Sequence, residues 1–282
     1  MQVYTTKKDL LAILKSKKNK ELSLGFVPTM GALHKGHISL VQRAFNENEL
    51  VVVSIFVNPT QFDNEEDLDK YPNTLKQDLD LLEKVSTNII VFAPTKNDIY
   101  NDKIKSESYN FNGLEKVMEG TFRAGHFNGV ATIVELLLKT VGPDKAYFGE
   151  KDFQQLQIIK RLVTLKDISC QIIGCPIERE PSGLAMSSRN ERLSKSTRKK
   201  AGFIYETLKT AKIKFGTKSA PIVKEWVFNQ FLNSSLFELE YFEITDIDTL
   251  TPIAKKQIDI KYRAFIAVYT EEVRLIDNIA LN

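Results

Sequence analysis

The stretch GFVPTMGALHKGHISLV, residues 25–41, contains the transition that decides the fold. Its first residues are apolar and favour a buried strand, whereas Ile38 and Phe45 further along lie on one face at helical spacing. The loop between these segments carries His34 and His37, which are two of the chain's three histidines. The stretch therefore predicts a strand, a glycine-containing loop and a helix, with both histidines at the helix N-terminus.

The same alternation of strand and helix continues to about residue 176. Apolar runs predict strands, and amphipathic segments between them predict helices. The expected strands are 22–27, 50–57, 88–94, 145–149 and 169–177, and the expected helices are 36–49, 74–85, 129–142 and 151–166. Strands separated by helices pair in parallel, so we expect an α/β fold with a doubly wound, mostly parallel sheet.

The pattern changes after Pro176, where a turn-rich stretch leads into a different order of elements. Helices are expected over 195–212 and 220–232, followed by strands over 237–246, 262–270 and 273–281. Helices followed by adjacent strands favour a smaller α+β domain with an antiparallel sheet. We therefore expect one domain over residues 1–176 and a second over residues 177–282.

Composition narrows the class of protein. The 282 residues are 43% hydrophobic and 27% charged, and the formal net charge is +3 because 39 basic residues face 36 acidic ones. This balance offers no support for a nucleic-acid partner bound through phosphates. Cys170 and Cys175 have neither a zinc nor a redox spacing. No apolar stretch is long enough for a signal peptide or a membrane span, so we expect a cytoplasmic globular protein that binds no membrane.

The histidine loop has the features of a phosphate site. It follows a parallel strand at its carboxyl end, where open α/β sheets bind ligands, and a helix N-terminus presents N–H groups with a partial positive charge. Gly31 and Gly36 allow a ligand to approach the backbone, and His34 and His37 can donate to phosphate oxygens. Alternatively, the histidines are structural, or form a metal pair that lacks a third ligand.

Two neutral amides, Asn58 and Gln61, end the second strand and should face the same crevice. Such amides can form hydrogen bonds with hydroxyl and carboxylate groups without adding charge. The alternative is that these residues only form an ordinary Asn-Pro turn. The third histidine, His126, is flanked by glycine on its N-terminal side and precedes a helix. For His126 we expect a loop-shaping or dimer-contact role, with nucleotide binding as the less favoured interpretation.

Two later segments can add charge and hydroxyl groups to such a site. Lys151 and Gln155 are spaced i, i+4, so they can share a helical face on which the lysine neutralises triphosphate charge. Asp152 can accept from a ribose or bind Mg²⁺ through water, whereas Gln154 should point elsewhere. A solvated first turn is the alternative. Further on, GLAMSSRN (183–190) offers serine hydroxyls and an arginine fork for phosphate oxygens.

These motifs together resemble the H-x-G-H nucleotidyltransferases and, more closely, the pantothenate synthetase (pantoate–β-alanine ligase) family. The matching pieces come in the family's order between residues 22 and 193: VPTMGALHKGH, VVVSIFVNPTQF, YPNTL, GHFNGVATIV, YFGEKDFQQLQIIKRLV and GLAMSSRN. Several long motifs in order make the resemblance specific. After residue 193 it rests on length and on the order of helices and strands.

The resemblance implies a two-step ligation. The carboxylate of pantoate attacks the α-phosphate of Mg-ATP to give pantoyl adenylate and pyrophosphate, and the amine of β-alanine then displaces AMP to give pantothenate. ATP and Mg²⁺ would be the required cofactors, and no residue is assigned as a metal ligand. The family is a homodimer whose C-terminal domain closes over the nucleotide, so a homodimer is expected here.

The resemblance also assigns residues by motif. The implied catalytic residues are His37, His34, Lys151, Ser187, Ser188 and Arg189. The implied ATP-binding residues are Met30, Gly31, Ala32, Leu33, His34, Lys35, Gly36, His37, Gly149, Glu150, Lys151, Asp152, Glu178, Met186, Ser187, Ser188 and Arg189. The implied substrate-binding residues are Gln61, Gln155, Asn58 and Met30.

Some positions depart from the family's usual pattern. Asn73 stands where arginine is common, Ala124 where proline is common, Glu135 where lysine is common, and Pro181 where acidic or small polar residues are usual. No role is carried onto Asn73 or Glu135. The alternative enzyme is another adenylyl- or cytidylyltransferase, which would want basic residues at Asn58 and Gln61 for a phosphate-bearing acceptor. A non-catalytic nucleotide-binding module would be expected to lack the histidine, lysine and arginine of these motifs.

Overall fold

A computed structural model describes residues 1–17, 22–62, 68–69, 71–100, 104–232 and 234–282. The described residues divide into two compact units. The first comprises Met1–Glu150 and Gln155–Pro176, and the second comprises Lys151–Gln154 and Ile177–Asn282. The short segment Lys151–Gln154 therefore packs with the C-terminal part of the chain.

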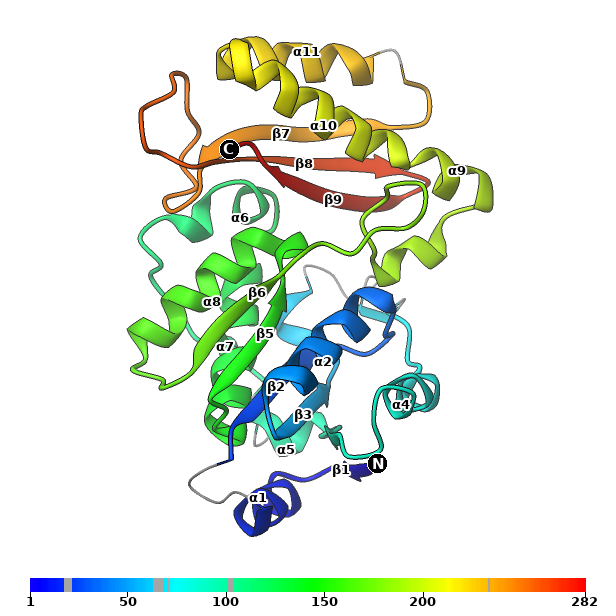
Figure 1. The fold of residues 1–282 in the computed structure, drawn as a ribbon, viewed down its shortest axis with the longest axis vertical. Coiled ribbons are helices and arrows are strands. Elements are labelled where there is room, and N and C mark those ends of the chain that lie inside the picture. The colour runs from blue at the N-terminus through cyan, green and yellow to red at the C-terminus, as the bar shows by residue number, and fades with distance from the viewer. Residues whose placement is uncertain (18–21, 63–67, 70, 101–103, 233) are drawn as a thin grey trace. The chain divides into compact units, whose positions relative to one another are not determined.

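Within the described part of the first unit, six parallel strands form one sheet in the order β1-β4-β3-β2-β5-β6 (Figure 1). The strands are β1 (Gln2–Tyr4), β2 (Leu24–Thr29), β3 (Leu50–Ile55), β4 (Ile90–Phe92), β5 (Lys145–Gly149) and β6 (Gln171–Cys175). The helices are α1 (Lys7–Lys17), α2 (Lys35–Glu47), α4 (Leu75–Glu83), α5 (Lys96–Tyr100), α6 (Glu119–Phe122), α7 (His126–Val141) and α8 (Phe153–Leu165). The predicted doubly wound parallel sheet is confirmed.

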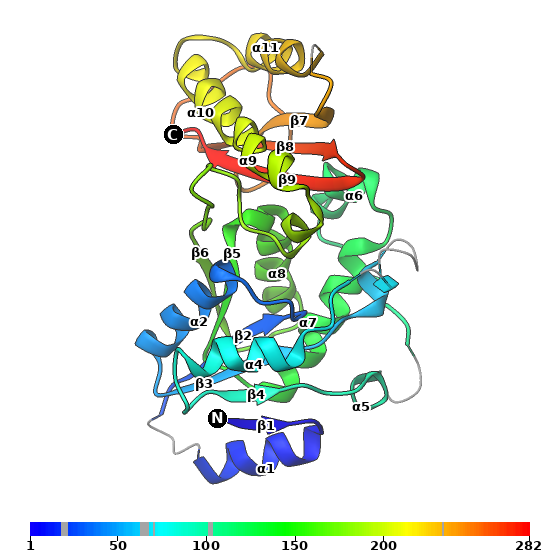
Figure 2. The same ribbon diagram turned by 90° about the vertical axis from the view of Figure 1, so that its right-hand side faces the viewer.

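Both faces of this sheet are covered, as the apolar strand sequences require. Phe26 and Val27 in β2 and Val52 and Val53 in β3 are all 0% exposed. Adjacent residues on a strand point to opposite faces, so full burial at neighbouring positions needs a helical layer on each side. Figures 1 and 2 show α2 on one side of the strands and α7 and α8 on the other.

In the second unit, the described residues form a three-stranded antiparallel sheet of β7 (Glu238–Asp246), β8 (Tyr262–Thr270) and β9 (Val273–Ala280). The helices α9 (Lys195–Lys200), α10 (Gly202–Thr217) and α11 (Ala220–Leu232) accompany it. Leu208, Phe231, Phe242 and Ile266 belong to one buried cluster that joins the helices to the sheet. The predicted α+β unit with an antiparallel sheet is confirmed.

The helix expected over 195–212 is interrupted, so that expectation was wrong. α9 ends at Lys200 and α10 begins at Gly202. At Gly202 the chain approaches another segment closely, since an added Cβ would lie 1.9 Å from the carbonyl oxygen of Ser182. In the described ranges, no helix has both the length and the apolar character needed to cross a bilayer.

Glu135, one of the departures from the family's pattern, is a structural anchor on α7. It is 9% exposed, and its carboxylate lies 2.6 Å from the Lys139 ammonium and 3.3 Å from that of Lys166. The Tyr109 hydroxyl donates to it at 2.8 Å. Burial pushes the pKa of Glu135 upward, but the hydrogen bonds from Lys139, Tyr109 and Lys166 outweigh burial, so the pKa is lowered.

Replacing this anchor should reduce stability in a pH-dependent way. We expect Glu135→Gln to lower the free energy of unfolding by about 1–3 kcal/mol at neutral pH, because a buried charged acceptor is lost. A lowered folded-state pKa stabilises the fold above the unfolded pKa of about 4.3, and the contribution disappears as the pH falls through the lower folded value. Urea unfolding of the wild-type protein and of Glu135→Gln should show the difference between their free energies of unfolding shrinking from pH 7 to pH 3.

The surface pair Glu206–Lys209 provides the control, because its side chains are 61% and 45% exposed. Glu206→Gln should change stability by less than about 0.5 kcal/mol at any of these pH values. A Glu135→Gln variant as stable as this control at pH 7 would contradict the anchoring role.

Candidate active site

The loop between β2 and α2 turns through two residues in the left-handed region. Gly31 has φ +82° and Ala32 has φ +49°. Asp78 on α4 holds this turn, because its carboxylate accepts from the N–H of Ala32 at 3.0 Å and from that of Leu33 at 2.7 Å. A Cβ at Gly31 would lie 3.1 Å from the carboxylate, so the carboxylate packs tightly against the turn.

Asp78 is 1% exposed and was missed by the sequence analysis. Burial raises the pKa of this carboxyl, whereas the hydrogen bonds from Leu33, Ala32 and Thr74 oppose the rise. A buried carboxylate with a set of donors around it keeps its place because each donor would otherwise lose a partner. The signal that could have found it is its position: Asp78 lies one helical turn before the buried Leu82.

The two histidines of the loop cap α2 together. His34 is the N-cap residue, and its Nδ1 accepts from the N–H of Gly36 at 3.1 Å. The Nδ1 of His37 accepts in turn from the N–H of His34 at 3.3 Å, which completes a reciprocal capping box. The ring centroids lie 4.1 Å apart. The predicted position at a helix N-terminus is confirmed.

These contacts decide the tautomer of both rings. A nitrogen that accepts a hydrogen bond carries no proton, so each neutral ring has its proton on Nε2. Both histidines therefore present an Nε2–H donor on the side of the ring away from the helix backbone. An N–H donor at a helix N-terminus suits an anionic ligand, because the helix dipole adds positive potential there.

Asn58 and Gln61 are brought together at the end of β3. Asn58 is 1% exposed, and its Nδ2 donates to Oε1 of Gln61 at 3.0 Å. Its Oδ1 accepts from the Tyr100 hydroxyl at 2.5 Å. Asn58 also caps the short 3-10 turn η1 (Pro59–Gln61), so it makes the Asn-Pro turn and orients Gln61 at the same time. Gln61 Nε2 contacts Met30 Sδ at 2.8 Å.

The third histidine fixes the main chain of the same segment. His126 Nδ1 lies 2.8 Å from the carbonyl oxygen of Gln61, and Arg123 donates to that oxygen at 3.3 Å. Gly129 lets α7 approach, because a Cβ there would lie 2.0 Å from the carbonyl oxygen of Thr60. Of the roles considered for His126, loop shaping is the one that these contacts display.

The segment after β5 forms the 3-10 turn η3 (Glu150–Asp152), which leads from Gly149 into α8. The Lys151 ammonium lies 3.7 Å from the Asp152 carboxylate. Gln155, in the first turn of α8, is half-buried, whereas Gln154 is 3% exposed. Gln154 is therefore a buried residue of this turn.

The serine-containing loop of the second unit begins in a short hairpin. The N–H of Met186 donates to the carbonyl of Glu178 at 2.9 Å. Ser187 then caps the 3-10 turn η4 (Ser188–Arg192), and its Oγ accepts from the N–H of Arg189 at 3.2 Å. Asn190, 1% exposed, ties the loop to Glu180 through a 2.8 Å hydrogen bond. The Ser187 hydroxyl also carries a proton, so it can donate a hydrogen bond while its oxygen accepts one in the cap.

The predicted site residues thus fall into two groups. The first unit carries Met30 to His37, Asn58, Gln61, Gly149, Glu150 and Gln155, and the second carries Lys151, Asp152, Glu178 and Met186 to Arg189. A parallel α/β sheet with H-x-G-H at the start of its second helix defines the class of H-x-G-H nucleotidyltransferase-like proteins.

Comparisons with known proteins refine this class. The family model for pantoate-beta-alanine ligase matches residues 2–280. A pantothenate synthetase from Christiangramia forsetii is 57% identical over 282 residues, covering 100% of both chains. One from Flavobacterium psychrophilum is 53% identical over 281 residues, also covering 100% of both. The chain belongs to the pantoate–β-alanine ligase family.

Solved structures agree with this assignment. A pantothenate synthetase from Thermus thermophilus superposes with a TM-score of 0.91 at 37% identity, covering 100% of this chain and 99% of that one. A pantoate-beta-alanine ligase from Francisella tularensis superposes with a TM-score of 0.82 at 37% identity, over 100% and 98% of the chains. The latter was solved in complex with beta-gamma ATP and beta-alanine.

Asp78 can be tested as the anchor of the histidine loop. Asp78→Ala removes the acceptor of two main-chain N–H groups, so we expect the free energy of unfolding to fall by about 2–4 kcal/mol. Amide hydrogen exchange at Ala32 and Leu33 in the loop should become faster, and the increase should exceed that seen in the helices. Mass-spectrometric exchange at peptide level measures this.

Asp80→Ala on the same helix is the matched control, because Asp80 is exposed. It should leave both stability and loop exchange unchanged. Exchange at Ala32 and Leu33 that follows only the global loss of stability in Asp78→Ala would overturn the anchoring role.

Proposed function

We propose that this chain joins pantoate to β-alanine at the expense of ATP, and that it does so in two steps through a pantoyl-adenylate intermediate. The family membership and the names of its relatives support the ligation. The observation that carries the mechanism is the reciprocal histidine cap, which aims two Nε2–H donors away from the start of α2. Pantothenate, AMP and pyrophosphate are the products.

The first step needs charge stabilisation rather than a base. The carboxylate of pantoate is already ionised, and it attacks the α-phosphate of ATP while the bond to pyrophosphate breaks. Negative charge grows on the leaving oxygen, where a positioned donor contributes about 3–4 kcal/mol. We assign this stabilisation to Nε2–H of His37 and of His34, and charge neutralisation of the phosphates to Lys151 and Arg189, helped by the hydroxyls of Ser187 and Ser188.

The other ATP contacts are proposed from the loops that carry these side chains. Gly31 and Ala32 turn with positive φ and bring the chain to the start of α2, where the partial positive charge of a helix N-terminus favours phosphate. The remaining proposed contacts are Met30, Leu33, Lys35, Gly36, Gly149, Glu150, Asp152, Glu178 and Met186. Main-chain atoms near Glu178 would meet the adenine, as the family resemblance implies.

Pantoate is proposed to bind at the neutral amides. Gln61 is oriented by Asn58 and contacts Met30, and Gln155 occupies the first turn of α8. Amides can bind both the hydroxyl groups and the carboxylate of pantoate without neutralising the attacking carboxylate. In the second step, β-alanine enters as a free amine near Gln61 and attacks the adenylate carbonyl. Positioning of the amine contributes several kcal/mol, about 7 or more in the best intramolecular cases.

Mg²⁺ is proposed to arrive as part of the ATP substrate. Mg²⁺ keeps several waters and is usually held by phosphates with one or two carboxylates. The Asp152 carboxylate, 48% exposed, is an oxygen donor suited to a water-mediated contact. The ion would screen the triphosphate while the residues of this chain hold and orient it.

A cytoplasmic location and a homodimer complete the proposal. ATP-dependent biosynthesis fits the cytoplasm, and the thiols of Cys170 and Cys175 are free, as in a reducing compartment. The homodimer is inferred from the family resemblance. Light scattering of the purified protein tests it, with twice the 32.1 kDa chain mass as the expected result.

The first experiment follows pyrophosphate released from Mg-ATP with pantoate, in the presence and absence of β-alanine, together with AMP and pantothenate. Release that requires pantoate, and steady turnover that requires both acids, would support the ligase and its adenylate step. Release with a phosphorylated acceptor instead of pantoate would keep the nucleotidyltransferase chemistry and overturn the substrate.

His37 can be separated into its capping and donating atoms. We expect His37→Ala to lower pantoate-dependent pyrophosphate release at least about 100-fold, because the donor toward the leaving oxygen is lost. The lost cap should cost about 0.5–2 kcal/mol of stability, which leaves the protein folded. Stopped-flow or quench-flow release of pyrophosphate and thermal unfolding measure the two effects.

His37→Asn is the matched control, because its side-chain oxygen can replace the capping Nδ1 but nothing replaces Nε2–H. It should recover stability and remain as slow as His37→Ala. Recovery of both stability and rate in His37→Asn would show that the cap, not the donor, is what the reaction needs.

Gln155 is expected to discriminate between the two substrates of the first step. Gln155→Ala should raise the KM for pantoate at least about 10-fold and the KM for ATP less than about 2-fold, because the lost amide binds the acid. Steady-state kinetics with each substrate varied in turn provide the measurement. Equal rises in both KM values would remove Gln155 from the pantoate pocket.

A further inference from the structure

Strand β9 of the second unit carries two adjacent buried polar residues, Asp277 and Asn278. They are 4% and 1% exposed. Neighbouring residues on a strand point to opposite faces of the sheet. In the ladder with β8, Asn278 is paired with Phe265 and Asp277 with Ile266, so the two side chains lie on different faces. Each is used to hold a different segment of the unit.

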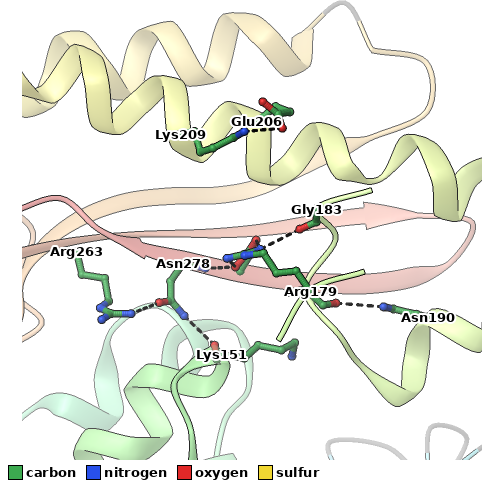
Figure 3. A network of polar contacts seen from close by, with 10 residues as sticks. Lys151, Arg179, Gly183, Asn190, Glu206, Lys209, Arg263 and Asn278 are labelled. Atoms are coloured by element: carbon green, nitrogen blue, oxygen red, sulfur yellow. Dashed lines mark hydrogen bonds and ion pairs between the residues drawn. The ribbon is translucent and has the colours of Figure 1, made fainter. Parts of the chain in front are cut away.

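Asn278 holds the main chain of Lys151. Its Nδ2 donates to the carbonyl oxygen of Lys151 at 2.9 Å, and its Oδ1 accepts from the guanidinium of Arg263 (Figure 3). Arginine has donors and no acceptor, so the oxygen of the amide must face Arg263 and the NH₂ group must face Lys151. The guanidinium is itself seated 3.9 Å from the ring centroid of Phe153. Orientation of the amide is therefore fixed from both sides.

Asp277 holds the other segment. It accepts two hydrogen bonds from Arg179, at 2.6 and 2.9 Å, in a bidentate pair. Arg179 also donates to the carbonyl of Gly183 at 3.1 Å and lies 3.5 Å from the ring centroid of Tyr205. These contacts fix the hairpin that leads into Met186. One dipeptide of β9 thus braces the Lys151 turn on one face and the approach to the serine loop on the other.

We infer that Asn278 is a positioning residue for Lys151, which it serves by fixing the main chain from which the ammonium extends. The inference rests on the proposed function, in which Lys151 neutralises phosphate charge. Misplacement of a binding group by about 1 Å can cost about 100-fold in rate, so the hydrogen bond that fixes the main-chain carbonyl of Lys151 should affect the reaction rate. If Asn278 were purely structural, its replacement would instead lower stability and change the KM values for ATP and pantoate equally.

The test compares Asn278→Ala with Asn282→Ala. Asn282 is a matched control, since its Nδ2 also donates to a main-chain carbonyl, that of Ile260, at 2.8 Å, and its Oδ1 accepts from the N–H of Tyr262 at 2.7 Å. Asn278→Ala should raise the KM for ATP and the Kd for a β,γ-imido ATP analogue at least about 10-fold, with the KM for pantoate changed less than about 2-fold. Asn282→Ala should change none of these.

A double-mutant cycle with Lys151→Ala separates positioning from general stability. If Asn278 acts through the lysine, adding Asn278→Ala to Lys151→Ala should weaken analogue binding less than about 2-fold further. Multiplied effects in the double variant, or equal rises in both KM values for Asn278→Ala, would overturn the inference. The cycle measures analogue binding and therefore does not depend on the ligase reaction. If the proposed function were wrong, the wild-type protein would bind the analogue but would not release pyrophosphate from ATP and pantoate.

Asn278→Asp covers the case in which the alanine variant does not fold. It keeps an acceptor for Arg263 but places a carboxylate oxygen against the carbonyl of Lys151. The same selective loss of ATP affinity is expected, and unchanged affinity in this folded variant would also overturn the inference.

Discussion

The turn between β2 and α2 requires an acceptor for two main-chain N–H groups that point inward. Ala32 and Leu33 donate these hydrogen bonds to Asp78, a buried carboxylate on a separate helix. Gly31 and Ala32 both adopt positive φ, which costs energy for the alanine, and the carboxylate offsets that cost. The turn delivers His34 to the N-cap of α2, so the geometry of the histidine pair depends on Asp78.

Much of the fold could be predicted because its signals are local. Apolar runs alternating with amphipathic helices indicated the parallel sheet, and adjacent strands near the end indicated the antiparallel one. β1 escaped prediction because Gln2–Tyr4 is too short to show a period, and its place beside β4 is set by a long-range pairing. The break before Gly202 also has a distant cause, since the carbonyl of Ser182 lies against that glycine.

The candidate site likewise contains some residues that the sequence could predict and others that it could not. His34, His37 and the serine loop could be proposed because their motifs are contiguous and their chemistry is evident from residue type. Asp78 contacts the loop across 45 and 46 residues, and Asn278 contacts Lys151 across 127 residues. A single aspartate on an amphipathic helix, or an asparagine in a strand, gives no comparable sequence signal. The residues proposed to bear the chemistry could therefore be identified from the sequence, and those that position them could not.

Three of the proposed site residues share one hydrogen-bonding arrangement. His34 and His37 at Nδ1, and Ser187 at Oγ, each accept a hydrogen bond from a main-chain N–H in a local cap. For the two histidines the cap occupies Nδ1, so the proton of a neutral ring lies on Nε2, whereas the Ser187 hydroxyl accepts in its cap and can still donate its own proton. Arg263 orients the amide of Asn278, because it donates to the oxygen and the NH₂ group then faces the carbonyl of Lys151. A set of oriented donors stabilises an anion whose charge is growing, as the α-phosphate chemistry proposed for this site requires.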